Sequence, residues 1–200
     1  NLPHLCDRAG VAFVQAEIVG VDSQRQDLLL HQRPALSFGV LSLDVGAVTR
    51  NLEHLSGVPI KPLEEALQFL SQQDPEGPQP FRIVGAGPAG IEVALALRRR
   101  WPHRPLELQV RAGQLNATTR SILRRAHIHC VTDASAHASL LCTGSRAPSW
   151  LANSGFAVDH NGRVLTNSFL QLEGYSHLFA SGDCAVMEPQ PRPASGVWAV

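Results

Sequence analysis

The sequence predicts an α/β fold built on a doubly wound parallel sheet, and two observations lead to this expectation. First, a short apolar strand at 81–84 runs into a G-x-G-x-x-G loop and then into an apolar helix that Pro102 ends. An alternating stretch at 106–110 follows, so strand, loop, helix and strand form a βαβ unit within roughly thirty residues. Second, apolar stretches at 38–45, which Gly46 closes, and at 140–144, which ends in Gly144, flank this unit as buried strands.

Composition excludes several classes of protein. The 200-residue chain is 44% hydrophobic and 17% charged, which is typical of a globular protein. Its 17 Lys and Arg balance its 17 Asp and Glu, so nucleic acid is not an expected partner. Lys61 is the only lysine, which excludes the phosphate loop of ATPases. The four cysteines are far apart, which predicts no metal site and suits a reducing, cytoplasmic location.

The elements before the glycine-rich loop follow from alternation and turn residues. Residues 11–21 alternate and are rich in β-branched side chains, which predicts a strand, and 28–30 follow a polar turn as a second strand. Residues 38–45 form a near-continuous apolar run, as in a strand that is buried on both faces. Residues 61–70 combine an early proline, early acids and helical apolar spacing, which predicts a helix before the proline-rich connector at 74–80.

The elements after the βαβ unit are shorter. The turn Asp-His-Asn-Gly at 159–162 lies between two alternating arms, which is the pattern of a β-hairpin. Gly182 and Asp183 stand at the carboxyl end of the last expected strand. The expected elements are, in order, a helix at 118–125, strands at 128–131 and 140–143, the hairpin over 156–165 and a strand at 178–180.

The glycine-rich loop is the most informative stretch. Gly85 permits a tight turn, Gly87 lets the backbone approach a pyrophosphate, and Gly90 lets the helix pack closely on the sheet. Pro88 and Ala89 lie in the first helical turn, whose N–H groups and dipole favour phosphate. The loop therefore predicts dinucleotide binding in a Rossmann-like domain, and the alternative is a fortuitous glycine-rich turn.

Two charged residues near this loop have more than one interpretation. The position that contacts the adenosine ribose, at the end of the second strand, falls at Arg111. Arginine there favours a 2′-phosphate and hence NADP(H), and the alternative is a solvent-facing side chain in a site with little preference. Glu92 is expected in the first turn of the helix, where it either offsets the helix dipole or faces the nicotinamide side of the site.

The order of the motifs resembles the flavoproteins that have two dinucleotide-binding domains. The motifs are VLSLDVGA, VGAGPAGIE, LLCTGSRAP and LFASGDCA, and together they span nearly the whole chain. Among the pyridine nucleotide–disulfide oxidoreductases, the chain resembles the type II NADH dehydrogenase branch. The segments VPIKPLEEALQFL and PRPASGVWAV resemble the flavin module that occurs alone or fused to selenide, water dikinase.

The resemblance implies a domain organisation and cofactor contacts. An NAD(P)-binding domain at 51–148 would be inserted in an incomplete FAD-binding domain made of 1–50 and 149–200. Glu92 would lie near the nicotinamide, while the three glycines of the loop would hold the NAD(P)H pyrophosphate. Gly144 would mark a crossing between the domains.

The Gly-Asp motif at Gly182 and Asp183 has its own implication. In the resemblance, the carboxylate of Asp183 accepts a hydrogen bond from the FAD ribitol. Without the resemblance, an N-cap or turn residue is the better interpretation of Asp183.

The implied function is electron transfer from NAD(P)H through FAD to an acceptor such as a quinone, with no side chain named as catalytic. Peripheral membrane contact and association with selenide, water dikinase are further implications. One alternative is a non-catalytic nucleotide-binding or regulatory module. Another is a sulfide:quinone-type reductase whose redox cysteines lie outside this chain.

The chain departs from the family pattern in three ways. The first glycine-rich loop of the family, which holds the FAD pyrophosphate, is missing, and so is the C-terminal region, so both ends are expected to be cut from a longer chain. The stretch 130–142 also leaves no room for the antiparallel strands of the family. We therefore expect a gap in the sequence within 134–139, and the alternative is a naturally minimal domain with a tight turn there.

Overall fold

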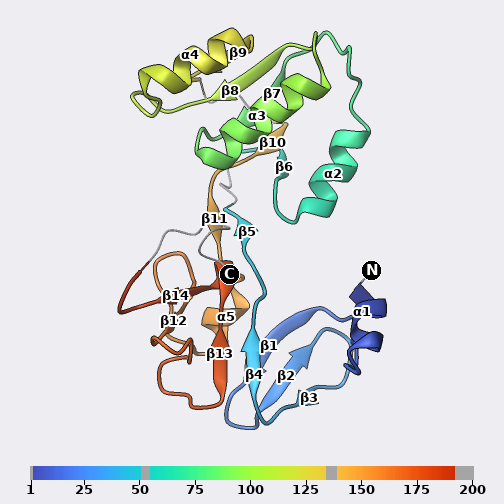
Figure 1. The fold of residues 1–200 in the computed structure, drawn as a ribbon, viewed down its shortest axis with the longest axis vertical. Coiled ribbons are helices and arrows are strands. Elements are labelled where there is room, and N and C mark those ends of the chain that lie inside the picture. The colour runs from blue at the N-terminus through green and yellow to red at the C-terminus, as the bar shows by residue number, and fades with distance from the viewer. Residues whose placement is uncertain (1, 51–54, 134–138, 192–200) are drawn as a thin grey trace. The chain divides into compact units, whose positions relative to one another are not determined.

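The structure is a computed structural model that describes residues 2–50, 55–133 and 139–191. Its chain divides into two compact units (Figure 1). Unit 1 contains residues 1–46 and 147–200, and unit 2 contains residues 47–146. The domain boundaries expected from the sequence, with 51–148 as the inserted domain, and the cofactor of each domain stay predictions.

Unit 2 is built on a five-stranded sheet whose paired strands are all parallel. The chain moves outward in one direction from β7 through β8 to β9, and then returns to the other side of β7 with β10. A doubly wound sheet has such a reversal. In spatial order the strands are β6 (Val58–Pro59), β10 (Leu140–Leu141), β7 (Phe81–Val84), β8 (Leu106–Gln109) and β9 (Ile128–Val131).

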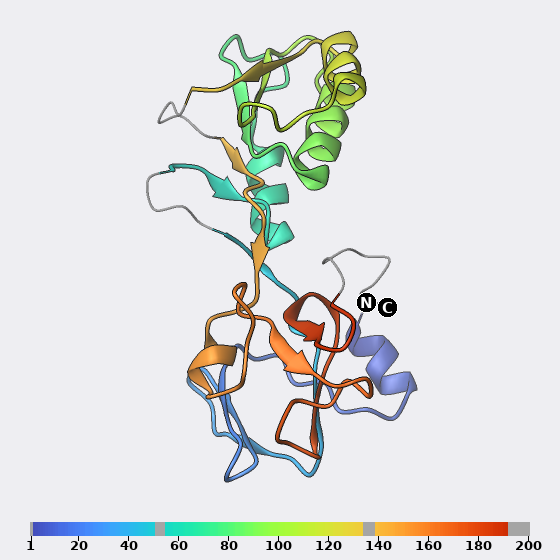
Figure 2. The same ribbon diagram turned by 90° about the vertical axis from the view of Figure 1, so that its left-hand side faces the viewer.

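The helices of unit 2 cover one face of this sheet. Figure 2 shows α3 and α4 together on one side of the strands. Phe81 packs edge-on against Trp101, with ring centroids 5.0 Å apart, and contacts Phe69 at 6.1 Å. The helices that contribute to this core are α2 (Leu63–Ser71), α3 (Pro88–Arg100) and α4 (Ala117–Arg125).

The opposite face of the sheet carries an ion-pair network. Arg82 follows Phe81 on β7 and therefore points to the other face. Its guanidinium lies 2.6 Å from the Glu107 carboxylate on β8 and 3.3 Å from Asp133, just after β9. One buried arginine thus connects β7 and β8 to the segment that follows β9.

The connection from β9 to β10 includes the predicted gap. Among the described residues, no strand lies between these two strands. Residues 134–138 lie outside the described residues, so the expected break there stays a prediction. Ser139 is described, and its amide donates to the Arg82 carbonyl at 3.3 Å.

Two short strands close unit 2 at its chain ends. Strand β5 (Val48–Thr49) pairs antiparallel with β11 (Ser145–Arg146). The Thr49 side chain is buried, and its hydroxyl accepts a hydrogen bond from the Lys61 amide at 2.8 Å.

Unit 1 combines small sheets around a second core. One sheet has the order β1-β2-β3, β4 pairs parallel with β13, and β12 pairs parallel with β14. The core includes Leu43, Leu151, Val164 and Leu178, which are almost fully buried. The elements are α1 (Leu2–Arg8), β1 (Ile18–Asp22), β2 (Asp27–Leu30), β3 (Leu36–Ser37), β4 (Leu41–Leu43), α5 (Trp150–Asn153), β12 (Val164–Thr166), β13 (Leu178–Ala180), the 3₁₀ turn η1 (Gly182–Cys184) and β14 (Ala185–Met187).

Two of the predicted strands were too long. In the stretch 11–21, the strand begins only at Ile18, where pairing with β2 starts. Residues 38–45 form a strand only at 41–43, and Ser42 is exposed, so this strand is not buried on both faces. A strand exists only where a partner accepts its hydrogen bonds, and alternation alone does not show where the partner ends.

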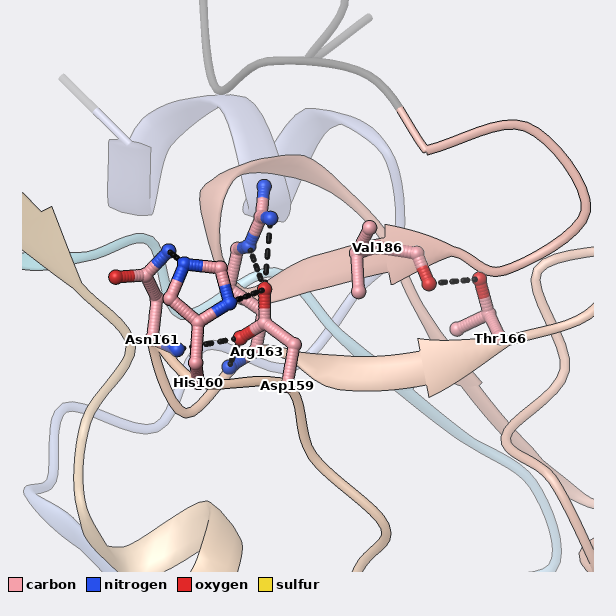
Figure 3. A network of polar contacts seen from close by, with 6 residues as sticks. All are labelled: Asp159, His160, Asn161, Arg163, Thr166 and Val186. Atoms are coloured by element: carbon pink, nitrogen blue, oxygen red, sulfur yellow. Dashed lines mark hydrogen bonds and ion pairs between the residues drawn. The ribbon is translucent and has the colours of Figure 1, made fainter.

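The predicted hairpin turn is present and is held by Asp159 (Figure 3). Its carboxylate accepts hydrogen bonds from the amides of Asn161 and Arg163 at 2.8 and 2.9 Å. The Arg163 guanidinium donates to the other oxygen at 2.7 and 2.9 Å. Burial raises the pKa of Asp159, but these hydrogen bonds from Arg163 and Asn161 outweigh burial, so the pKa is lowered.

We expect this turn to weaken in acid. A lowered pKa in the folded state stabilises the fold above the ordinary Asp value of about 3.9, and this stabilisation is lost as the pH falls below it. At pH 7, Asp159→Asn should lower the free energy of unfolding by about 1–2 kcal/mol. Urea denaturation at pH 7 and pH 3 measures this, with exposed Glu173→Gln as control. An equal loss at both pH values would contradict the ion-pair explanation.

Candidate functional site

The loop after β7 is closely packed. Gly85 has φ +104°, and a Cβ there would lie 2.3 Å from the Cys142 carbonyl oxygen. A Cβ on Gly90 would lie 1.8 Å from the Gly85 carbonyl oxygen. Real Cβ atoms do not come this close to backbone oxygens, so both positions require glycine. The start of α3 is therefore held directly against the ends of β7 and β10.

The tip of the loop is open by contrast. Gly87 is the N-cap of α3, Pro88 is its first residue, and no atom lies within 4 Å of a Cβ built on Gly87. Pro88 and Ala89 are exposed. The first N–H groups of a helix have no partner within the helix, so they and the dipole favour an anion here. The loop thus combines a rigid base with an accessible tip, which fits a pyrophosphate.

Glu92 lies one turn later than the sequence suggested. The helix begins at Pro88, so Glu92 is its fifth residue, and the first turn contains no acidic residue. Compensation of the helix dipole falls off beyond the first turn, so that explanation of Glu92 is weakened. The side chain is exposed. Its predicted place near the nicotinamide remains a prediction.

Arg111 lies just beyond the carboxyl end of β8, on an exposed turn. Its amide donates to the Gln114 side chain at 2.9 Å, and its carbonyl accepts from the Gln114 amide at 3.1 Å. Gly113 closes the turn with φ +74°. Sequence reasoning missed a second arginine here, Arg120 in α4, which donates to the Leu115 carbonyl at 3.2 Å. Two cations thus flank the loop after β8.

Strand β10 is the neighbour of β7 on the side opposite to β8, so its end also lies beside the glycine-rich loop. Cys142 packs beneath the glycine loop, and burial raises the pKa of its thiol to about 11, so it is an inert neutral group at pH 7. Thr143 donates its hydroxyl to the Arg50 carbonyl. Gly144, with φ +96°, accepts from the Arg50 amide at 2.9 Å. These contacts hold together the chain segment that enters unit 2, at Arg50, and the segment that leaves it, at Thr143 and Gly144.

A second candidate region lies in unit 1, where β4 and β13 end side by side. Leu43 pairs with Ala180, so Asp44 and the turn Gly182–Cys184 follow at the same edge. Gly182 has φ +68°, and a Cβ there would lie 2.3 Å from an Asp44 carboxylate oxygen. The structure therefore brings Asp44 next to the predicted Gly-Asp motif.

Asp44 was missed by the sequence prediction. Its signal was available, because it is the one carboxylate in the apolar run 38–45 and lies near the end of that run, two residues before Gly46. Parallel strands end at the same edge of a sheet, so carboxylates that follow two of them can meet.

The described residues contain no group of three or more His, Cys, Asp or Glu that could hold a metal ion. Across the described ranges, no helix is both long and apolar enough to cross a membrane.

Comparison with known proteins gives relatives and solved structures, while no family model matches. The chain is 25% identical to ferroptosis suppressor protein 1 of Mus musculus over 232 residues, which cover 94% of this chain and 61% of that protein. It is 27% identical to demethylphylloquinone reductase NdbB of Synechocystis, covering 96% of this chain and 57% of the relative. The chain thus spans about 60% of the length of these relatives.

The match to the mouse protein is longer than the part of this chain that it covers. The match to the mouse protein runs over 232 residues, whereas 94% of this chain is about 188 residues. About 44 positions of the match therefore have no counterpart in this chain.

Two solved structures have the same arrangement. NADH:rubredoxin oxidoreductase from Clostridium acetobutylicum has a TM-score of 0.79 at 15% identity and covers 98% of this chain and 56% of its own. An engineered water-forming NADPH oxidase bound to NADPH has a TM-score of 0.76 at 15% identity, covering 92% and 49%. The chain therefore has the α/β fold of NADH- and NADPH-dependent oxidoreductases.

Proposed function

We propose that the chain belongs to an FAD-dependent NAD(P)H oxidoreductase that passes electrons to a quinone. The loop from Gly85 to Gly90 carries the proposal, because its base admits no side chain and its tip is open at a helix N-terminus. The loop also follows the strand at which the sheet order reverses, where such sheets bind their ligands. When bound, NAD(P)H supplies a hydride that the flavin accepts.

The residues of unit 2 divide the proposed dinucleotide site into parts. The backbone N–H groups of Gly87 and Ala89 and the dipole of α3 would hold the pyrophosphate, with Pro88, which has no N–H, at the first helical position. The adenosine half lies over the end of β8, beside Arg111. The nicotinamide half extends toward the end of β10, where Gly144 leaves space because no atom lies within 4 Å of a Cβ built there.

The quinone acceptor rests on the relatives. One of them is a demethylphylloquinone reductase, and that chemistry fits a flavin that receives a hydride and releases electrons. A quinone is apolar, so the proposal includes peripheral contact with a membrane. It also includes the cytoplasmic location that the widely spaced cysteines suggest. Association with selenide, water dikinase stays an implication of the sequence resemblance, since neither relative carries that name.

Absorbance spectroscopy tests the proposal most directly. The purified protein should show the yellow flavin spectrum, lose it on anaerobic addition of NADPH or NADH, and regain it when a quinone is added. A flavin that NAD(P)H does not bleach would contradict the proposed enzyme. Dinucleotide binding without flavin would favour a regulatory module, and reduction by sulfide instead would favour a sulfide:quinone-type reductase.

Arg111 is proposed to select NADPH. Arginine at this place can pair with the 2′-phosphate, and Arg120 adds positive charge to the same loop. The five substitutions of the engineered NADPH oxidase support this idea, since they remove one aspartate and introduce two arginines.

We expect Arg111→Glu to shift the preference from NADPH toward NADH by one or two orders of magnitude, or about 1.4–3 kcal/mol. The glutamate repels the 2′-phosphate and can accept hydrogen bonds from the ribose hydroxyls. The ratio of kcat/KM for the two cofactors measures the shift. Arg125→Glu, the same charge change at the exposed end of α4, should leave the ratio unchanged. An unchanged ratio in Arg111→Glu would count against the assignment.

Asp183 is proposed to bind the ribityl chain of FAD. Asp183→Ala should weaken FAD binding by about 10- to 150-fold, because a hydrogen bond to a charged group contributes about 1.5–3 kcal/mol. The measurement is flavin retention on dilution, followed by fluorescence. Glu188→Ala removes an exposed carboxylate after β14 and serves as the control. Full flavin occupancy in Asp183→Ala would overturn this role.

A further inference from the structure

Cys184 lies beneath the edge where β4 and β13 end. It is the last residue of the turn Gly182–Cys184, and its side chain is 0% exposed. Its sulfur lies 3.1 Å from the Ser181 carbonyl oxygen and 3.7 Å from the Leu43 carbonyl oxygen. The thiol therefore contacts the backbone of both strand ends.

The loop after β4 completes the surroundings of this sulfur. The backbone amides of Val45 and Gly46 act on this thiol, and their effect is to lower its pKa. Burial raises the pKa of the Cys184 thiol, and the negative charge of Asp44 raises it further against the effect of these amides. The group is therefore a neutral thiol, which can donate to the backbone carbonyls of Leu43 and Ser181.

These contacts connect the two segments that carry the carboxylates. Asp44 directly follows Leu43, whose backbone carbonyl contacts the thiol, and directly precedes Val45, whose amide lowers the pKa of the thiol. Asp183 directly precedes Cys184. The Asp44 carboxylate lies against the backbone of Gly182, so close that a side chain at residue 182 would not fit. If the loop after β4 moved relative to the loop after β13, this contact would be lost.

We propose that Cys184 is a positioning residue of the flavin site, which holds Asp44 and Asp183 in one fixed arrangement toward the ribityl hydroxyls. This inference rests on the proposed function, because it assigns a role within the same site. Asp44 then acts as a second acceptor for the polyol. Two carboxylates at neighbouring strand ends suit a ligand that offers adjacent hydroxyl groups.

Two substitutions separate the polar role of the thiol from its packing. Cys184→Ser keeps a donor and acceptor but is smaller and less apolar. Cys184→Val fills the space with carbon and removes both polar functions. If the hydrogen bonds matter, serine preserves the site and valine damages it, whereas a packing role gives the reverse order.

We expect Cys184→Val to raise the Kd for FAD about tenfold, and Cys184→Ser to keep it within about threefold of the wild type. In the flavin-free protein, hydrogen exchange at the amides of Val45 and Gly46 should quicken about tenfold in the valine variant only. The same two substitutions at Cys6, in helix α1, are the matched controls and should change neither measurement.

Wild-type affinity and exchange in Cys184→Val would overturn the inference, as would an equal loss in both variants. The exchange experiment needs no flavin, so it separates two kinds of failure. If the wild type binds no FAD, the proposed function fails. If the protein binds FAD but the amides of the loop after β4 are indifferent to residue 184, only the positioning role fails.

Discussion

A single methyl group at Gly90 is expected to remove dinucleotide binding and to lower the free energy of unfolding by about 3 kcal/mol. The Cβ of Gly90→Ala would lie 1.8 Å from the Gly85 carbonyl oxygen and 3.3 Å from the Cβ of Cys142. Neither neighbour is the end of a flexible side chain. Helix α3 must therefore move off the sheet, which displaces the N–H groups proposed to bind the pyrophosphate.

Gly87→Ala provides the matched comparison. The same methyl group meets no atom within 4 Å at Gly87, so unfolding should stay within about 0.5 kcal/mol of the wild type. Dinucleotide binding should still weaken, because the methyl group occupies the approach of the pyrophosphate. Urea denaturation and calorimetric titration with NADPH measure the two effects. A stable Gly90→Ala protein that binds NADPH normally would contradict both the packing and the proposed site.

The parts of the fold that could be predicted are those with local causes. Strand, glycine loop and helix at 81–100 follow from residues that are neighbours in the sequence, and the helix ends before Pro102 as expected. Strand β9 lies within the predicted bounds, 128–131. The close approach at Gly85 and Gly90 was also expected, because the spacing of the glycines reflects contacts within one loop and helix.

The parts that could not be predicted depend on distant pairings. Strand β6 was not predicted, because its two residues form a strand only by pairing with β10. Strand β10 was predicted at 140–143, but it has only the two residues that pair with β6 and β7. No local pattern contains that information. Residues 11–17 have strand-like alternation, yet the strand forms only from Ile18, where β2 offers a partner.

The same distinction applies to the candidate site. Asp44 and Gly182 are far apart in the chain and meet only because β4 and β13 pair in register. The polar contacts of Cys184 depend on the same pairing, so its motif alone gave no reason to single it out. Sequence motifs identified the loops, and the pairing of strands determined which loops share an edge.

Arg98 also acquires its role from residues outside its own helix. Three arginines at 98–100 form the last turn of α3, where the helix dipole favours cations, and the structure gives the first of them a specific role. The guanidinium of Arg98 donates to five backbone carbonyls at 2.9–3.0 Å, those of Trp101, Pro102, Arg104, Ala126 and His127. It thus joins the end of α3 to the entry of β8 and to the end of α4.

We expect Arg98→Met to lower the free energy of unfolding by about 3–5 kcal/mol. Methionine keeps much of the apolar stem but offers no donor, so several carbonyls lose their partner, each at about 1 kcal/mol or more. Arg99→Met changes the same charge at an exposed neighbouring position and should cost less than about 0.5 kcal/mol. Thermal and urea denaturation measure both variants. Equal stability of the two would show that charge at the helix end, rather than the five hydrogen bonds, is what this position supplies.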